Sequence, residues 1–306
     1  MASGISDGFV SISPFSKKDS ASSKLQSDHV EVAVNTVIGT INGWNISNPA
    51  YHRFFAKDAS QVFAQTSLAD ISSEALEGKI ASQLKTISTR LLSGEVNIQV
   101  VVEGYETFFE KLAKQLSEGN FHLLAEKPEG WNEKKNITGI VVDTSKYTVR
   151  ESAVVTVEYK DTENDGRPSV LRVPYVHVQE IVSKKEMIVA GVHVPGAASQ
   201  YPKDGLAALA NAIDSLWEKH GRKVDVIGIG DFNSTPERVA KHFEGAVLAP
   251  DYWTHANPRF LAASKYDMAI VREAESEPVK CEMHPLADVS ETSQALAKGL
   301  KSLTNC

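Results

Sequence analysis

Cysteine is the scarcest side chain in this 306-residue protein, which has only two, Cys281 and Cys306. Two thiols cannot form a disulfide framework or a four-ligand structural zinc site. They suit a reducing compartment, and a protein exported without a conventional signal peptide would have the same thiol content. We therefore expect a cytoplasmic protein or one that is exported by an unconventional route.

Long apolar runs are also missing. No stretch approaches the roughly 20 residues that a membrane helix needs. Residues 1–23 lack the apolar block of a secretory signal, because Asp7, Pro14, Lys17 and Asp19 interrupt them. The sequence thus predicts a soluble protein with no integral membrane segment.

Positive charge is not in excess, since 32 Lys and Arg stand against 39 Asp and Glu, for a formal net charge of -7. The chain therefore offers no overall basic face for long-range capture of nucleic acid or of an anionic membrane. A nuclease is not excluded, because a bound divalent cation can supply positive charge locally. Neither a GxxxxGK nor a GxGxxG phosphate-binding loop occurs, so nucleotide cofactors are not expected.

Short runs of apolar and β-branched residues, bounded by turn residues, dominate the rest of the sequence and predict strands. Eight such runs are candidates: 35–42, 96–102, 137–143, 152–159, 171–182, 187–194, 224–230 and 266–271. Helical spacing of apolar residues appears at 73–92, 107–116, 203–220 and 290–303. Residues 161–169 have the composition of a hairpin tip. The pattern predicts sheets covered by helices, with residues 1–28 as a flexible tail and 29–306 as a single domain.

Polar residues stand where several of these predicted strands end. The run VDVIGIGDFN ends on Asp231 and Asn233, and residues two apart in a strand point to the same side. Other strand ends carry Asn45, Glu103 and His193. Each has a structural alternative: Asn45 could cap a turn, Glu103 could begin the next helix, and His193 could be an ordinary strand-end residue. Their joint occurrence is what favours a site.

In order and setting, these residues resemble the endonuclease/exonuclease/phosphatase superfamily over about residues 35–286. The resemblance implies a four-layer α/β/β/α sandwich of two mainly antiparallel sheets, with its site at one edge. It also implies Asn45 and Glu103 as metal-holding residues, and a catalytic set of Asp231, Asn233, His193, Asp267 and His284. Arg172 falls where relatives often carry a substrate contact, although an Arg in an amphipathic strand is usually only solvated.

The match departs from the superfamily at its last motif. The usual Ser-Asp-His, one further residue and Pro is here Glu282, Met283, His284 and Pro285. Either Glu282 replaces the missing acid from a shifted backbone, or that acidic contribution is absent. Asp267 also has an alternative role, as a surface ion-pair partner of Lys265 or Arg272.

These residue types suit phosphate ester hydrolysis. Mg²⁺, with Mn²⁺ as the alternative, would neutralise the phosphoryl oxygens through a few protein oxygen ligands. Asp231 could accept the proton of the attacking water, and Asn233 could orient it without adding negative charge. His284, steadied by Asp267, and His193 could stabilise charge in the transition state.

We therefore expect a Mg²⁺-dependent phosphoesterase that uses activated water, with a phosphodiester in nucleic acid as the first substrate. A phosphatase of inositol phosphates or phosphoinositides is the alternative, although the Trp-Cys-Asp-Arg segment usual in such enzymes is here SKYDMA. A third hypothesis is an inactive binding module of the same fold, which Met283 suggests. The oligomeric state is not readable from the sequence.

Overall fold

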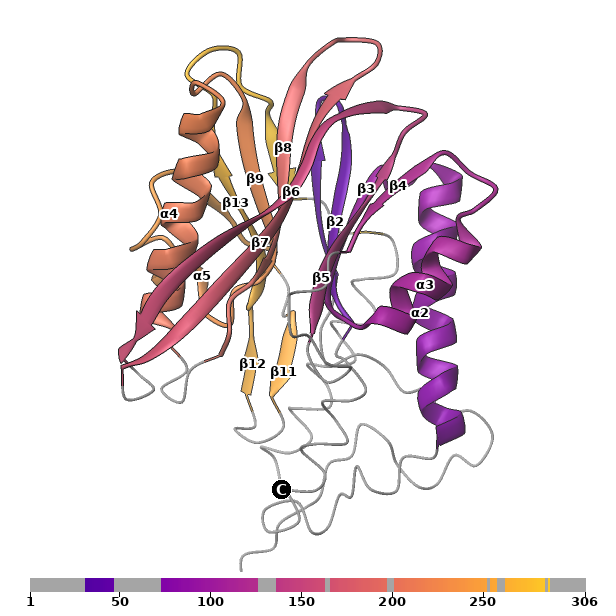
Figure 1. Cartoon of the computed structure of the whole chain (residues 1–306), viewed down its shortest axis with the longest axis horizontal. Coiled ribbons are helices and arrows are strands. Elements are labelled where there is room, and N and C mark those ends of the chain that lie inside the picture. The colour runs from indigo at the N-terminus through magenta and orange to yellow at the C-terminus, as the bar shows by residue number, and fades with distance from the viewer. Residues whose placement is uncertain are drawn as a thin grey trace, which may run out of the picture.

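The computed structural model describes residues 31–46, 73–125, 136–162, 166–196, 201–251, 254–257, 262–283 and 286. Two β-sheets pack face to face, with helix α4 outside one sheet and helices α2 and α3 outside the other (Figure 1). The predicted four-layer sandwich is confirmed. No helix among these residues has the length and apolar character needed to cross a membrane.

The first sheet has six strands in the order β14-β1-β2-β3-β5-β4. Its strands are β1 (Val32–Thr36), β2 (Gly39–Asn45), β3 (Ile98–Gly104), β4 (Phe121–Leu124), β5 (Ile137–Asp143) and β14 (Cys281–Met283). Only the β2–β3 pair is parallel. Helix α2 (Ser73–Ser93) connects these two strands, and α3 (Glu106–Gln115) follows β3.

The second sheet also has six strands, in the order β10-β13-β9-β8-β7-β6. Its strands are β6 (Tyr147–Asp161), β7 (Arg167–Glu180), β8 (Glu186–His193), β9 (Asp225–Asp231), β10 (Ala246–Leu248) and β13 (Asp267–Arg272). Here β8 and β9 form the parallel pair, and helix α4 (Lys203–Lys219) connects them. The short elements α5 (Pro236–Val239), β11 (His255–Asn257) and β12 (Ala262–Ser264) complete the described chain.

Alternation along the strands explains the layers. In β9, Val226 packs in the apolar cluster beneath α4, whereas Ile227 and Ile229 pack in the cluster between the two sheets. A third cluster joins the first sheet to α2 and α3, where Phe108 and Leu112, one helical turn apart, are fully buried. Strands buried on both faces read as continuous apolar runs, which is why β8 and β9 were recognisable in the sequence.

One strand prediction was wrong. Residues 35–42 were expected to form a single strand, but β1 ends at Thr36 and β2 begins at Gly39. The Thr36 hydroxyl closes the turn by donating to the Gly39 carbonyl at 2.8 Å and accepting the Ile38 N–H at 3.2 Å. Gly39 adopts a φ of 150°, which favours glycine.

The hairpin predicted around residues 161–169 is confirmed, since Asp161 pairs with Arg167 at the ends of β6 and β7. The predicted tail, residues 1–28, and the predicted helix over residues 290–303 lie outside the described residues. The division into a tail and one domain therefore stays a prediction.

Candidate active site

Polar residues gather where the two parallel strand pairs end. Asn45 is the last residue of β2, His193 the last of β8 and Asp231 the last of β9, while Glu103 is the next-to-last residue of β3. The carboxyl ends of parallel strands are the usual location of ligand sites in α/β proteins. We call this end of the sandwich the mouth.

Two side-chain pairs cross from one sheet to the other at the mouth. The Asn45 Nδ2 donates to Asp231 Oδ2 at 3.0 Å. The His193 Nε2 lies 3.5 Å from Glu103 Oε1, with side chains 22% and 16% exposed. Strand β2 of the first sheet thus contacts β9 of the second, and β8 of the second sheet contacts β3 of the first. Four predicted site residues, distant in sequence, are brought together.

The position of Glu103 depends on an irregularity in β3. Val102 lies opposite Asn45 in the parallel register and packs between the sheets, so regular alternation would turn Glu103 toward the helices. Instead the β3–β5 register shifts between Val101 and Gly104, and Glu103 has a φ of 55°. A bulge of this kind redirects a side chain, and here it brings Glu103 to His193. The alternative in which Glu103 begins α3 is wrong, because that helix begins at Glu106.

Asp231 is 2% exposed, and donors from two elements surround its carboxylate. Besides Asn45, the backbone N–H of Asn233 donates to Oδ1 at 2.7 Å and the Asn233 Nδ2 lies 3.2 Å from Oδ2. The same Nδ2 is 2.9 Å from the Val194 carbonyl. Asn233 has a φ of 47°, a left-handed conformation that Asn tolerates better than most residues. The predicted proximity of Asp231 and Asn233 thus arises through a tight turn rather than a continuing strand.

Asp267 lies level with Asp231 and His193 across three neighbouring strands of the second sheet. It is directly opposite Asp231 in the antiparallel β9–β13 pair, just as His193 is level with Asp231 in the parallel β8–β9 pair. Side chains that lie opposite share a face of the sheet. The surface pairing of Asp267 with Arg272 is not found, since Arg272 contacts Asp214 and Glu244 and Asp267 is 1% exposed.

Thr254 supports this arrangement of Asp231 and Asp267, and no motif in the sequence pointed to it. It is fully buried, and its Oγ1 accepts the backbone N–H of Asp267 at 3.0 Å. Thr254 thereby fixes the first residue of β13 beside Asp231.

Arg172, the predicted substrate contact, lies on β7 with its side chain partly exposed. Val176 and Val178 of β7 pack between the sheets, so Arg172, an even number of residues away, belongs to the same face. The pairing of β7 with β8 ends at Tyr175 opposite Ala190, three residues before Arg172 on one strand and three before His193 on the other. The position of Arg172 is compatible with a contact at the mouth.

The last motif is described only in part. His284 lies outside the described residues. Met283 and Cys281 pack against the cluster between the sheets, whereas Glu282 points away from it and is exposed. Whether Glu282 replaces the missing acid stays a prediction, and in β14 its side chain is turned away from the space between the sheets.

A second group that sequence reasoning missed stands at the start of α4. The Tyr201 hydroxyl lies 2.8 Å from His242 Nε2, and the Arg238 guanidinium lies 4.9 Å from the centre of the Tyr201 ring. Burial, with a smaller effect of Lys203, lowers the pKa of His242 below its usual value. The imidazole is thus mainly neutral at pH 7 and suited to hydrogen bonding with the phenol.

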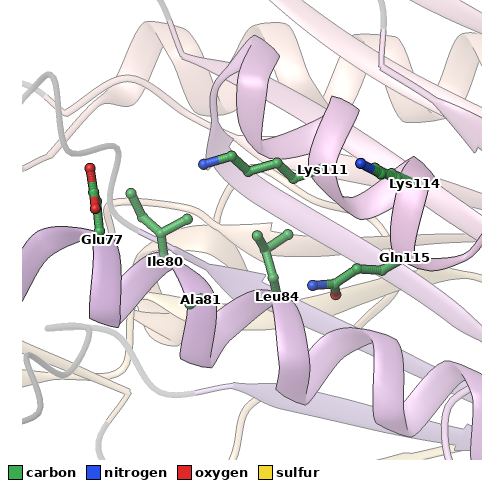
Figure 2. Close-up of a pocket in the computed structure, with 7 residues that line it drawn as sticks. All are labelled: Glu77, Ile80, Ala81, Leu84, Lys111, Lys114 and Gln115. Atoms are coloured by element: carbon green, nitrogen blue, oxygen red, sulfur yellow. The ribbon is translucent and has the colours of Figure 1, made fainter.

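A groove of about 260 Å³ lies elsewhere, between α2 and α3 (Figure 2). Ile80, Ala81 and Leu84 form its floor, and Lys111 and Lys114 approach from α3. It lies on the outer face of the first sheet and contains none of the residues at the mouth. The chemistry is better sought at the mouth.

No protein-family model and no curated protein matches this sequence. Solved structures do match. The catalytic domain of human Nocturnin, solved with a bound sulfate anion, aligns with a TM-score of 0.56 and 13% identity, over 84% of this chain and 92% of that one. An endonuclease/exonuclease/phosphatase family protein from Bacteroides thetaiotaomicron aligns with a TM-score of 0.52 and 14% identity, over 80% and 84%.

A humanized TDP2 from D. rerio, carrying 14 mutations, aligns with a TM-score of 0.51 and 12% identity, over 82% of this chain and 86% of that one. At such identities these likenesses show a common fold. Activity has to be argued from the residues at the mouth.

Proposed function

We propose that this chain, which has the fold of the endonuclease/exonuclease/phosphatase superfamily, is a divalent-metal-dependent phosphoesterase that uses water as its nucleophile. The observation that carries the proposal is the pair of contacts across the mouth, Asn45 with Asp231 and His193 with Glu103. These contacts bring two carboxylates, an amide and an imidazole together at the mouth. That combination suits hydrolysis of a phosphate ester.

The residues at the mouth fit a magnesium ion. No group of three or more His, Cys, Asp or Glu side chains able to hold a metal occurs among the described residues, which speaks against a cage made wholly of protein. Mg²⁺ normally takes one or two carboxylates and leaves its other positions to water and phosphate. Glu103 would supply an anionic oxygen and Asn45 a neutral amide oxygen, while the Asn45 Nδ2 donates to Asp231.

The backbone at the mouth supports a functional role. Glu103 and Asn233 are two of the five non-glycine residues with positive φ among those described. Such conformations cost of order 1–3 kcal/mol and concentrate at functional sites. The strained backbone of Glu103 places its side chain beside His193.

Each side chain then has a task. The bound ion would neutralise charge on the phosphoryl oxygens and polarise the ester. Asp231, held by its three donors, accepts the proton of the attacking water. The Asn233 amide orients that water or donates to a phosphoryl oxygen, and Asn45 fixes the Asp231 carboxylate. His193, whose Nε2 faces Glu103, stabilises negative charge near the leaving oxygen.

For the substrate we propose a phosphodiester of nucleic acid. Arg172 supports this choice, since it lies on the face of β7 that is turned toward the first sheet, from which a positive side chain could reach a second phosphate. Asp267 and His284 would act as a further pair, with Asp267 orienting the histidine.

A phosphatase of inositol phosphates or phosphoinositides is the second candidate. The net charge of -7 favours it, because a polyanionic nucleic acid is repelled more strongly than a small phosphate ester. The packing of Met283 where the superfamily has an acid is the observation behind the third candidate, an inactive binding module.

A substrate panel separates the three. The protein would be incubated with single- and double-stranded oligonucleotides, inositol phosphates and phosphoinositides, each with Mg²⁺ and with a chelator. We expect strand cleavage that needs the metal. Release of inorganic phosphate without strand cleavage would favour the phosphatase, and no turnover on any ester would favour the binding module.

A further inference from the structure

Exposed apolar side chains concentrate at the end of the sandwich opposite the mouth. Of the five large apolar residues most exposed among those described, four lie there: Val37, Leu92, Ile181 and Val182. Val37 is in the β1–β2 turn, Leu92 is near the end of α2, and Ile181 with Val182 begins the β7–β8 turn. These turns lie at the top of Figure 1, while β2, β3, β8 and β9 run from this end to the mouth. We call it the distal end.

The β7–β8 turn has a defined structure that directs its apolar residues outward. Glu180 accepts the Ser183 N–H with its carboxylate, and its own backbone N–H donates to the Lys185 carbonyl at 2.8 Å. The Lys184 N–H donates to the Glu180 carbonyl at 3.0 Å. The contacts with Ser183 hold the pKa of Glu180 below its usual value. Val182, 86% exposed, therefore stands at the tip of an ordered turn.

The neighbouring turn ties this tip to the rest of the distal end. The Ile181 N–H donates to the Lys146 carbonyl at 2.9 Å, which links the β7–β8 turn to the β5–β6 turn. The Lys146 Nζ reaches the Asn97 Oδ1 at 3.2 Å, and the same Asn97 Oδ1 accepts the Thr40 N–H at 3.1 Å. Turns from both sheets are thus joined into one surface.

Lysines surround the apolar tip. Lys184 and Lys185 follow it directly and are exposed, and neither forms an ion pair within the described part of the chain. The nearest acids are occupied: Glu180 caps the turn, and Glu186 contacts His177 at 3.0 Å. The acidic loop after β13 lies two strands away from β8 in the sheet, where Glu275 pairs with Arg222 at 3.3 Å.

We propose that the distal end docks on an anionic lipid membrane. Apolar side chains on an ordered turn enter the interfacial region, while adjacent lysines are attracted to acidic headgroups. Charge complementarity favours this occupant over a second copy of the chain, because two copies that met at this tip would bring Lys184 and Lys185 of each copy against those of the other. The mouth would then face solution, away from the bilayer, and this attachment adds to the proposed function without depending on it.

The test is co-sedimentation with vesicles of phosphatidylcholine alone and of phosphatidylcholine mixed with phosphatidylserine. We expect binding only to the anionic vesicles, weakened by added salt. Val182→Asp should reduce the partition coefficient at least about ten-fold, since it replaces apolar contact with a repelled charge. The matched control is Val170→Asp, because Val170 is also exposed, at 48%, but lies on β7 away from the distal end. It should bind like the unchanged protein.

A second pair of variants tests the charge. Lys184→Glu with Lys185→Glu should lower binding by at least about ten-fold, whereas Lys111→Glu with Lys114→Glu, which reverses the same number of charges on α3, should not. Equal loss in both pairs, or no binding of the unchanged protein to anionic vesicles, would overturn the proposal. So would a concentration-dependent dimer that Val182→Asp abolishes, because the distal end would then be an interface between copies. Thermal unfolding of every variant checks that the fold is retained.

Discussion

The two ends of the sandwich present different kinds of side chain. At the mouth the strands end on Asn45, Glu103, His193 and Asp231, and two of the nearby backbones have positive φ. At the distal end the β1–β2 and β7–β8 turns close the strands, with polar groups hydrogen-bonded inside the turns and apolar side chains outside. Non-glycine residues with positive φ occur at both ends, Glu103 and Asn233 at the mouth and Lys184 in the β7–β8 turn, so the ends differ in the side chains that they present rather than in backbone strain.

The difference assigns separate roles to similar residues. Strand β9 begins with Asp225 and ends with Asp231, and both carboxylates are almost fully buried. At the distal end, Asp225 accepts the N–H groups of Ala274 and Val279 at 3.0 and 2.8 Å, one with each oxygen. Asp231 accepts side-chain amides at the mouth. One carboxylate fastens the chain, and the other is the one to which we assign the chemistry in our proposal.

Exchanging each carboxylate for an amide gives the largest contrast. Asp231→Asn should lower kcat at least about a thousand-fold, because an amide cannot accept the proton of the attacking water. Asp225→Asn should leave kcat within about two-fold while lowering the free energy of unfolding by about 1–3 kcal/mol, since its new NH₂ faces an N–H donor. Steady-state kinetics and urea unfolding measure the two effects. Equal losses of kcat in Asp231→Asn and Asp225→Asn would contradict the assignment of separate roles to the two carboxylates.

Tyr147 should give a smaller effect, confined to stability. Its hydroxyl is buried and donates to the Ile38 carbonyl at 2.5 Å, joining β6 to the β1–β2 turn at the distal end. Tyr147→Phe should lower the free energy of unfolding by about 1–2 kcal/mol with no change in rate. Tyr159→Phe is the control, because Tyr159 is only partly buried beside the α4 cluster, and a change within about 0.5 kcal/mol is expected. A loss of activity in Tyr147→Phe would mean that the distal end affects the mouth.

The smallest expected effect is on pH dependence. Burial, and then nearby His177, lower the pKa of His220, whose ring lies 4.6 Å from that of His177. The unfolded chain therefore takes up this proton more readily, so stability contributed by His220 is present above about pH 6.5 and is lost as the pH falls below it. His220→Gln should flatten the decline in the free energy of unfolding between about pH 7 and pH 5. Unchanged slopes in urea titrations would rule out this contribution.

Much of the fold was readable from the sequence, because strands buried on both faces leave continuous apolar runs. The crossing helices were readable for a similar reason, since α4 buries Leu206, Leu209, Ile213 and Leu216 on one face. The β1–β2 turn was not, because Val37 and Ile38 continue the apolar run through it. A turn made by a threonine hydroxyl and one glycine has little signature within such a run.

The site was readable only as residue types at strand ends. Alternation predicted that Asp231 and Asn233 would lie together. Alternation alone would not bring Glu103 to His193, since the bulge after Val101 is a feature of the β3–β5 pairing. The contacts of Asn45 with Asp231 and of Glu103 with His193 could not be predicted either, because no repeat in the sequence marks the two parallel strand pairs. Thr254 was missed because its hydrogen bond to the start of β13 depends on tertiary structure and leaves no pattern in the sequence.

The central claim is that the mouth holds one divalent ion through Glu103 and its neighbours, and calorimetric titration with Mg²⁺ and Mn²⁺ tests it most directly. We predict one bound ion per chain, with affinity reduced at least about ten-fold in Glu103→Gln and unchanged in Glu110→Gln, an exposed position on α3. Ion binding that is equal in all three proteins, or absent from the folded unchanged protein, would contradict the account.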